Sequence, residues 1–215
     1  MNTEGSLAGE LAHVRRARAH WEPAYDRMVA GLSASGAGAA APALGERFPD
    51  VSLPDSAGRW TRMADLVGRG PIVLSVHRGG WCPYCRAEMA AWRKALPSLA
   101  SAGAQLVLMT PETGGRAERL RETVGPDPVI LCDVDHGVAM ALGLAVPLPQ
   151  ELQRSYRDAG LDLNRLTGGA GEFVPIPATF LIDRHGIVRF AHAEIDFRKR
   201  AEPADVLAAL SLLRG

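Results

Sequence analysis

Two cysteines stand three positions apart in the stretch RGGWCPYC, which runs from Arg78 to Cys85. A C-x-x-C pair suits reversible thiol–disulfide oxidation or half of a zinc site, and two such residues can also be inert buried thiols. The flanking Gly79, Gly80 and Pro83 are typical of a turn and not of a core segment. The pair therefore points to chemistry, and redox chemistry is the interpretation we favour.

The elements around the pair suit a reactive thiol. Residues 71–76, PIVLSV, predict a strand buried on both faces, and residues 82–96 predict a helix that Pro97 limits or bends. Cys82 then lies at a helix N-terminus, where free amide groups and the helix dipole favour the thiolate. Lowering a thiol pKa from about 8.5 to about 7 requires about 2 kcal/mol, of which a helix terminus supplies roughly 0.3 to 1 kcal/mol. The charge of Arg78 and a hydrogen bond from Cys85 are the nearest sources of the remainder.

A zinc site is the main alternative for these cysteines. Cys82, Cys85, Cys132 and His136 have the spacings C-x-x-C and C-x-x-x-H, which numerically form a zinc set. A structural zinc usually stabilises a small, loop-rich fold, whereas these residues fall in a well-cored domain. We therefore expect no metal and no other cofactor. We interpret Cys132 as a buried, inert thiol, with a second resolving cysteine as the alternative.

The amino-acid composition limits the classes of partner and the cellular compartment that we expect. The chain has 215 residues, 47% of them apolar, with 24 basic and 24 acidic side chains and no net charge. That balance gives no long-range attraction to nucleic acid or to anionic membranes, and no apolar run is long enough to span a bilayer. Three cysteines do not make a disulfide framework. Together with an N-terminus that lacks a signal-peptide pattern, this predicts a soluble, cytoplasmic protein that acts on small molecules or on other proteins.

Beyond residue 43, strand and helix patterns alternate. Further strands are predicted at residues 105–110, 128–132, 178–183 and 187–192, the last two as a hairpin, and helices at residues 116–124, 137–142 and 203–213. This order predicts an α/β fold of thioredoxin-like sandwich type, with a mixed central β-sheet flanked by helices. Residues 43–215 form the predicted domain, within which residues 146–174, helical at 147–160, exceed the minimal fold and line either a substrate groove or a dimer contact.

Residues 1–42 are predicted to be a separate N-terminal helical arm and linker. Apolar residues from Leu7 to Leu32 recur at spacings of three or four, and Pro23 divides the stripe into two short helices. The stripe packs either on its own domain or against a second copy in a homodimer. The following residues 33–43, SASGAGAAAPA, are small and lack the apolar bulk to pack.

Several other residues are candidates for a supporting role. In VPIPATFLID, Pro177 precedes a strand and the Ile176–Pro177 bond is a candidate for the cis form beside the thiols. Trp81 either shields the thiol or simply packs, and His77 is interpreted mainly as structural. The arginines of DFRKR, Arg198 and Arg200, are predicted to form a solvated basic face; the alternative is that one of them, or Arg78, supplies a positive charge at the active site.

These motifs together resemble a known family. RGGWCPYC before a helix, with IPATFLIDRHGIVRF about ninety residues later, is similar to the thioredoxin-fold redoxins and most of all to the peroxiredoxin-like branch of the alkyl hydroperoxide reductase and thiol-specific antioxidant (AhpC/TSA) family. The stretches at residues 49–76, 106–112 and 129–144 resemble the family's N-terminal hairpin and its first three core strands. The resemblance implies the thioredoxin fold over residues 48–213, with Cys82 and Cys85 as catalytic residues and Arg78, Trp81, Pro177 and Thr179 in support.

Two departures from the family pattern bear on the reaction. The active-site motif of typical peroxiredoxins has a threonine three residues before the attacking cysteine, and here Cys82 takes the threonine position and Cys85 the cysteine position. Typical members also carry an arginine just before the ATF stretch, where this chain has Pro177, as thioredoxins do. Helix position favours Cys82 as the attacking thiol, whereas the family pattern favours Cys85.

Two reactions follow from the resemblance. The first is that of a thiol peroxidase, an antioxidant enzyme that reduces hydroperoxides through a Cys82–Cys85 dithiol/disulfide cycle and is reset by a thioredoxin- or glutathione-type thiol. The second is exchange with a protein disulfide, as in a thioredoxin-like thiol–disulfide oxidoreductase. A zinc-stabilised interaction module is the non-enzymatic alternative.

Overall fold

A five-stranded mixed sheet forms the centre of the computed structural model, which describes residues 6–113, 115–168 and 172–214. The strand order is β5-β4-β3-β8-β9, and the strands are β3 (Ile72–Val76), β4 (Gln105–Thr110), β5 (Val129–Cys132), β8 (Ala178–Ile182) and β9 (Val188–Ala193). Strands β3, β4 and β5 are parallel, whereas β8 runs antiparallel to both of its neighbours. The predicted α/β sandwich with one antiparallel hairpin is confirmed.

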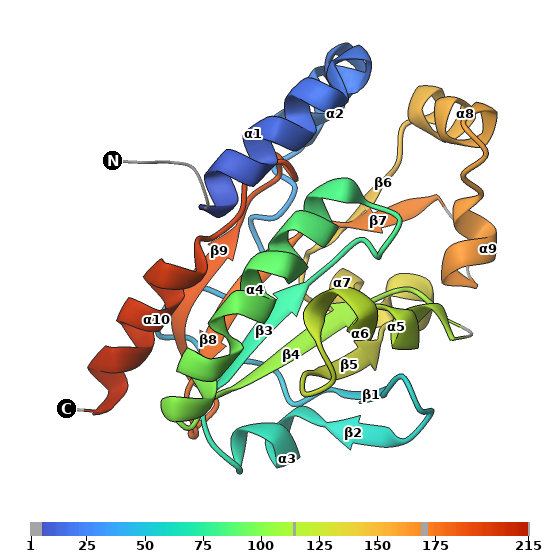
Figure 1. Ribbon diagram of the computed structural model, residues 1–215. Helices are drawn as coiled ribbons and strands as arrows, with labels where there is room; N and C mark the ends of the chain where they lie inside the picture. Colours follow the sequence, from blue (N-terminus) through green and yellow to red (C-terminus); the bar gives the residue numbers. More distant parts are fainter. Residues whose placement is uncertain (1–5, 114, 169–171, 215) are drawn as a thin grey trace.

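Strand β3 is the middle strand, and all five of its residues are buried. A near-continuous apolar, β-branched sequence is the pattern expected of a strand covered on both faces. Over one face of the sheet lie α4 (Pro83–Ser101), α6 (Arg121–Val124) and α10 (Pro203–Ser211), as Figure 1 shows. The short helices α5 (Arg116–Arg119), α7 (Gly137–Ala141), η2 (Val134–His136) and η3 (Leu212–Arg214) complete the connections.

Helix α4 is longer than the sequence predicts. Pro97 lies inside the helix, which continues to Ser101. Proline in a helix interior removes one backbone hydrogen bond, but the next turn places Leu99 in the core, where only 1% of its surface is exposed. Burial of that turn offsets the lost bond, so the expectation that Pro97 limits the helix was wrong.

The N-terminal arm packs on its own domain. It consists of α1 (Leu7–Ala17), η1 (Ala19–Trp21) and α2 (Glu22–Ala34), with Pro23 in the first turn of α2. Leu7 and Leu11 of α1 are buried, and α1 contacts α4. The carboxylate of Glu202 accepts hydrogen bonds from the first two amides of α1. The predicted pair of short helices is confirmed, and the apolar stripe is covered by the same chain.

The small-residue linker, residues 33–43, is more closely packed than predicted. A side chain at Gly38 would meet Ile176 at 3.3 Å, and one at Gly143 would meet the Cβ of Ala40 at 2.8 Å. Small residues here let the backbone pass directly over the 143–176 region, because no bulk stands between the two segments. The expectation that these residues lack the bulk to pack was wrong for this reason.

Two additions flank the sheet. The first is an N-terminal hairpin of β1 (Ser52–Pro54) and β2 (Trp60–Arg62), followed by α3 (Met63–Val67). The second is the insertion at residues 146–174, where α8 (Gln150–Asp158) and α9 (Leu163–Thr167) lie between β6 (Ala145–Pro147) and β7 (Phe173–Pro175), which pair with each other. The predicted helix in residues 147–160 is confirmed as α8, whereas the β6–β7 pair was not foreseen. Figure 1 shows the arm and α8 near the end of the sheet toward which β3 points.

Among the described residues, no helix combines the length and the apolar content that crossing a membrane would require.

Candidate active site

The C-x-x-C pair lies in the connection from the middle strand to α4. Cys82 has extended backbone angles and is the N-cap of α4, and its amide donates to the carbonyl of Gly79. Gly79 has φ +126°, and a side chain there would meet the Glu112 carboxyl group at 2.7 to 2.9 Å. Glycine is therefore required at this turn, both for its backbone angle and for the close approach of Glu112. The predicted strand–turn–helix placement of the pair is confirmed.

The two thiols are equally buried and differ in acidity. Cys82 is 2% exposed and Cys85 is fully buried. Burial raises the pKa of Cys82, but the hydrogen bond from the Cys85 thiol, the charges of Arg200 and Arg78 and the Cys85 amide outweigh burial and lower it to about 6. Burial and the neighbouring Cys82 sulfur raise the pKa of Cys85 well above its ordinary value. At neutral pH Cys82 is the thiolate and Cys85 is the thiol that donates to it.

One of the two arginines beside the thiols comes from DFRKR, the segment predicted to form a solvated basic face. The side chains of Arg198 and Arg200 are only 7% and 1% exposed, so that prediction was wrong. Arg200 places one guanidinium nitrogen 3.6 Å from the Cys85 sulfur and another 2.7 Å from a carboxylate oxygen of Glu88. Arg198 instead binds carboxylates of Glu22, Asp26 and Asp196 and fastens the arm. Burial is possible because both guanidinium groups have carboxylate partners.

Glu88 contacts each of the other polar side chains in a buried cluster near the thiols. Besides Arg200, its carboxylate accepts hydrogen bonds from the hydroxyls of Ser75 and Thr179, at 3.1 and 3.3 Å. His77 lies 3.8 Å from the same carboxylate and within 3.0 Å of the Ser75 hydroxyl. Burial lowers the pKa of His77 to about 4, so the ring is neutral at neutral pH. These contacts place His77 and Thr179 in the support of Glu88.

Arg78 lies on the other side of the pair. Its side chain is buried, its Nε donates to the carbonyl of Pro175 at 3.2 Å, and its guanidinium carbon lies 3.8 Å from the centroid of the Phe197 ring. Its Nη1 has no hydrogen-bond partner among the described residues. Arg78 is therefore held by a carbonyl and by a cation–π contact, and it keeps one unused donor.

Pro177 lies at the same end of the sheet as the thiols. Val76 pairs with Ala178 in the antiparallel register of β3 and β8, which sets Pro177 opposite His77. The Ile176–Pro177 peptide bond is trans, so the expectation of a cis bond was wrong. The amide of Ile176 donates to the carbonyl of Leu144, directly after the β6–β7 pair that ends at Pro175.

Aromatic rings from four segments cover the thiol pair. Trp21 and Tyr25 come from the arm, Trp81 from the turn before α4, Tyr156 from α8 and Phe197 from the segment after β9, with ring centroids 4.9 to 6.0 Å apart. Trp81 is half-buried and its indole N–H donates to the carbonyl of Arg78. The Tyr156 hydroxyl donates to that of Tyr25 at 3.5 Å. The arm and the insertion thus contact each other through these rings, and Tyr25 and Tyr156 lie near enough to Cys82 for its charge to add to the effect of burial on their pKa values.

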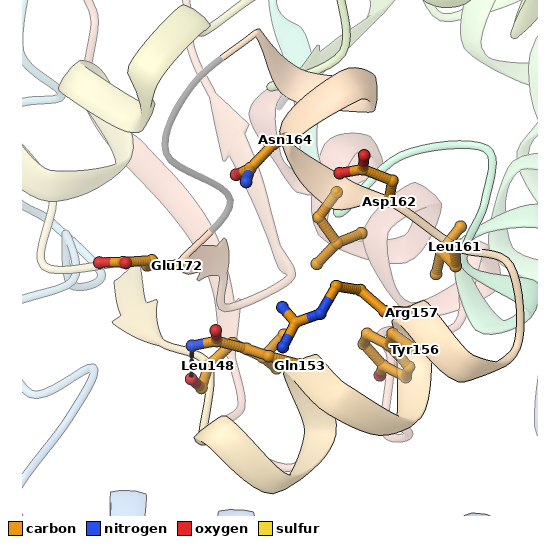
Figure 2. Close-up of a pocket in the computed structure, with 9 residues that line it drawn as sticks. Leu148, Gln153, Tyr156, Arg157, Leu161, Asp162, Asn164 and Glu172 are labelled. Carbon is orange, nitrogen blue, oxygen red and sulfur yellow. Dashed lines mark hydrogen bonds between the residues drawn. The ribbon is translucent and has the colours of Figure 1, made fainter.

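The insertion also holds a pocket of its own. It has a volume of about 140 Å³. Figure 2 shows Arg157 reaching from α8 into the space before α9, with the Gln153 amide bound to the carbonyl of Leu148. Tyr156 belongs both to this pocket and to the aromatic cover of the thiols.

Cys132 is separate from the pair. It ends β5, is 8% exposed, and burial followed by the charges of Asp55, Glu112 and Glu118 raises its pKa to about 11. Within the described residues, no group of three or more His, Cys, Asp or Glu side chains is close enough to hold a metal ion. The four residues of the zinc alternative are therefore not gathered into one site.

Sequence reasoning missed Glu88, Tyr156 and Phe197. A signal existed for Glu88, because it stands three residues after Cys85 and one before Met89, inside the buried face of α4. A charged side chain in an apolar helical stripe indicates a buried partner. No local signal pointed to Tyr156 or Phe197, since their roles depend on how distant segments cover the turn.

The sheet and the buried C-x-x-C at a helix start define a thioredoxin-fold thiol protein. Residues 44–191 match the AhpC/TSA family, and the chain belongs to that family. It is therefore a peroxiredoxin-like redox enzyme, as its motifs predict.

Individual relatives agree with this assignment. The chain is 27% identical over 148 residues to the thiol-disulfide oxidoreductase ResA of Geobacillus thermodenitrificans, a match that covers 68% of this chain and 67% of ResA. The solved structure of peroxidoxin BcpB from Mycobacterium tuberculosis is similar with a TM-score of 0.63 and 22% identity, over 81% of this chain and 99% of BcpB. Reduced Prx3 from Vibrio vulnificus in complex with hydrogen peroxide has a TM-score of 0.61 and 18% identity, over 80% and 98% of the two chains. The two structures support the fold.

Proposed function

We propose that this protein is a thiol peroxidase in which the Cys82 thiolate attacks a small hydroperoxide and Cys85 resolves the product. The observation that carries the proposal is the combination of acidity and burial at Cys82, whose pKa is lowered to about 6 although only 2% of the residue is exposed. A thiolate in this position is reactive at neutral pH. The aromatic cover gives a small oxidant easier access to it than the disulfide of a folded protein.

The cycle has three balanced steps. The Cys82 thiolate attacks one oxygen of the hydroperoxide, the O–O bond breaks, Cys82 becomes a sulfenic acid and the departing alkoxide takes a proton to become an alcohol. The Cys85 thiol then attacks the Cys82 sulfur; the S–S bond forms, and the hydroxide that leaves combines with the Cys85 proton as water. Two thiols of a thioredoxin- or glutathione-type donor, in a reducing cytoplasm, restore the dithiol and leave as a disulfide.

The two arginines supply charge for the first step. Both lower the pKa of Cys82, and each keeps one unpartnered nitrogen, Nη1 of Arg78 and Nε of Arg200. Donors aimed at a developing negative charge in a buried site stabilise the transition state. They take the place of the arginine that the family pattern carries where this chain has Pro177.

Stopped-flow oxidation of the reduced protein by hydrogen peroxide and by an organic hydroperoxide tests the proposal. Wild type and Cys132→Ser, the matched control, should react far faster than a free thiol with the same thiolate fraction. Cys85→Ser should accumulate a sulfenic acid on Cys82, and Cys82→Ser should form none. A wild-type rate no faster than that of a free thiol would reject the peroxidase, and sulfenic acid on Cys85 in Cys82→Ser at the wild-type rate would reverse the two roles.

Protein disulfide exchange is the second candidate function. It is favoured by the position of Pro177 beside the turn, next to an intact C-x-x-C, and by the likeness to a curated thiol-disulfide oxidoreductase. In this reaction Cys82 attacks a disulfide of another protein and Cys85 resolves the mixed disulfide. Insulin reduction measured beside the peroxide assay separates the two functions. A peroxidase should reduce insulin slowly as long as the N-terminal arm lies against the site.

A further inference from the structure

The buried charges around the thiol pair balance in the reduced protein. Arg78 and Arg200 are cations, while Glu88 and the Cys82 thiolate are anions; Arg78, Glu88 and Cys82 are at most 2% exposed, and the side chain of Arg200 is 1% exposed. Burial lowers the pKa of Arg78, and the charge of Arg200 lowers it to a smaller extent. The two guanidinium groups therefore repel each other. Two positive and two negative charges in one buried region cancel, which is the condition under which buried charges are tolerated.

The positive charge of Arg78 is balanced by the negative charge of the Cys82 thiolate. No carboxylate lies within ion-pair distance of Arg78 in the described ranges 6–113, 115–168 and 172–214, where its contacts are the carbonyl of Pro175 and the ring of Phe197. Arg198, two residues before Arg200, has three carboxylates around it by contrast. The ionisable groups whose negative form raises the pKa of Arg78 are Tyr156, Cys82 and Cys85, and of these only Cys82 is ionised at neutral pH.

The remaining titratable groups near the pair cannot take over this role. Glu112 accepts a hydrogen bond from the Gly80 amide and lies near the charges of Arg116 and Arg119. Burial keeps His77 neutral, and burial raises the pKa of Tyr25 and of Tyr156, so both phenols stay protonated. Loss of the thiolate therefore leaves one uncompensated positive charge.

We propose that formation of the Cys82–Cys85 disulfide creates a binding site for one small monovalent anion, of the chloride or thiocyanate class, held by Arg78 and Arg200. The inference rests on the proposed dithiol/disulfide cycle. Oxidation replaces the thiolate by a neutral S–S bond, and the anion restores the charge balance. Reduction by two electrons and one proton regenerates the Cys82 thiolate and the Cys85 thiol and releases the anion.

The groups that hold this anion are two donors that lack a partner among the described residues, together with a helix terminus. Nη1 of Arg78 and Nε of Arg200 are buried and unpartnered, and the α4 N-terminus beside them carries no side-chain cap. Arg200 also lines a groove of about 360 Å³ between α1 and the residues before α10, whose lining holds the basic side chains of Arg15, Arg198 and Lys199 and the carboxylates of Asp196 and Glu202.

The test is the midpoint potential of the pair as a function of anion concentration. The protein is equilibrated with a thiol–disulfide buffer, and chloride or thiocyanate replaces gluconate at constant ionic strength and neutral pH. Because the anion binds only the oxidised form, each tenfold rise in its concentration above its dissociation constant should favour that form tenfold, which lowers the potential by about 30 mV. A potential that does not change with either anion overturns the proposal.

Three variants make the result specific. Arg78→Met removes the uncompensated charge and should abolish the dependence, whereas Arg78→Lys keeps the charge and should retain it. Arg157→Met, an exposed arginine of α8, is the matched control and should behave as wild type. Wild-type dependence in Arg78→Met overturns the proposal. Thiol counting separates this failure from that of the proposed function: if peroxide yields no Cys82–Cys85 disulfide, the cycle itself is rejected.

Discussion

Strands β3 and β5 lie two positions apart in the sheet and run in the same direction, and each leads to a buried cysteine at its carboxyl end. Cys82 and Cys132 are 2% and 8% exposed, yet the pKa of the first is lowered to about 6 and that of the second is raised to about 11. Burial raises both values. The difference comes from the charges around each sulfur, which are guanidinium groups and a thiol donor beyond β3 and carboxylates beyond β5.

This contrast shows that both strand ends bury a cysteine, whereas side chains from distant segments set the pKa of each thiol. Arg200 stands 115 residues after Cys85 and reaches the site only because the chain returns past β9 to the start of α4. The carboxylates beside Cys132 come from the N-terminal hairpin and from the region of α5. The side chains that return to each strand end therefore lower the thiol pKa beyond β3 and raise it beyond β5.

The largest expected difference between the two strand ends is in alkylation. At neutral pH Cys82 should be mostly thiolate, whereas a thiol with a pKa near 11 is ionised to only about one part in 10⁴. Iodoacetamide treatment of the native reduced protein, followed by peptide mass spectrometry, should modify Cys82 first by a wide margin. Similar rates at the two sites would remove the electrostatic distinction on which the proposed function depends.

Many of the strands and helices that position the two cysteines could be predicted from the sequence. The strand at residues 105–110, the helical start at Cys82 and the hairpin at residues 178–192 have strong local patterns, because period and turn residues determine them. The C-x-x-C spacing alone indicated a dithiol at a helix terminus. Local pattern was also sufficient for α8.

The electrostatics of the site could not be predicted in this way. In sequence, DFRKR is a charged run that normally faces solvent, and only the packed carboxylates reveal that Arg198 and Arg200 are buried. The close passage of the linker over Gly143 is likewise a tertiary contact that no local pattern encodes. Both errors came from residues whose environment is set by segments far away in the chain.

The histidines at the two strand ends give a second, smaller test. Burial lowers the pKa of His77 from 6.5 to about 4, so the unfolded chain binds this proton more readily than the folded one. The corresponding stability is complete above about pH 6.5 and is lost as the pH falls toward 4, by at most about 3 kcal/mol.

His77→Gln should flatten this part of the acid limb when urea unfolding is measured across the range. Burial also lowers the pKa of His136, beyond β5, so His136→Gln should act in the same direction. An acid limb in His77→Gln as steep as that of wild type would mean that the folded protein binds a proton at this ring.

The smallest expected effect is on the acidity of Cys82 when the buried pair beneath it is neutralised. Replacing Arg200 alone would leave Glu88 buried without its partner, which destabilises the fold strongly, so the double variant Glu88→Gln/Arg200→Met is the appropriate one.

Arg200 makes the larger of the two arginine contributions to the Cys82 pKa, and without it the thiolate is stabilised by the Cys85 hydrogen bonds and by Arg78. The midpoint of Cys82 alkylation should then rise above its value of about 6, and the rate at that pH should fall about fivefold, the loss of thiolate that follows from a rise of about one pKa unit. The rate at Cys132 should not change, because its pKa is set by carboxylates at the other strand end. Arg119→Met removes an exposed positive charge near Glu112; it is the control for loss of an arginine outside the buried pair and should leave Cys82 as it is. If the double variant titrates as wild type does, the C-terminal segment does not tune the thiol, and the contrast between the two strand ends depends on the Cys85 donor and Arg78 alone.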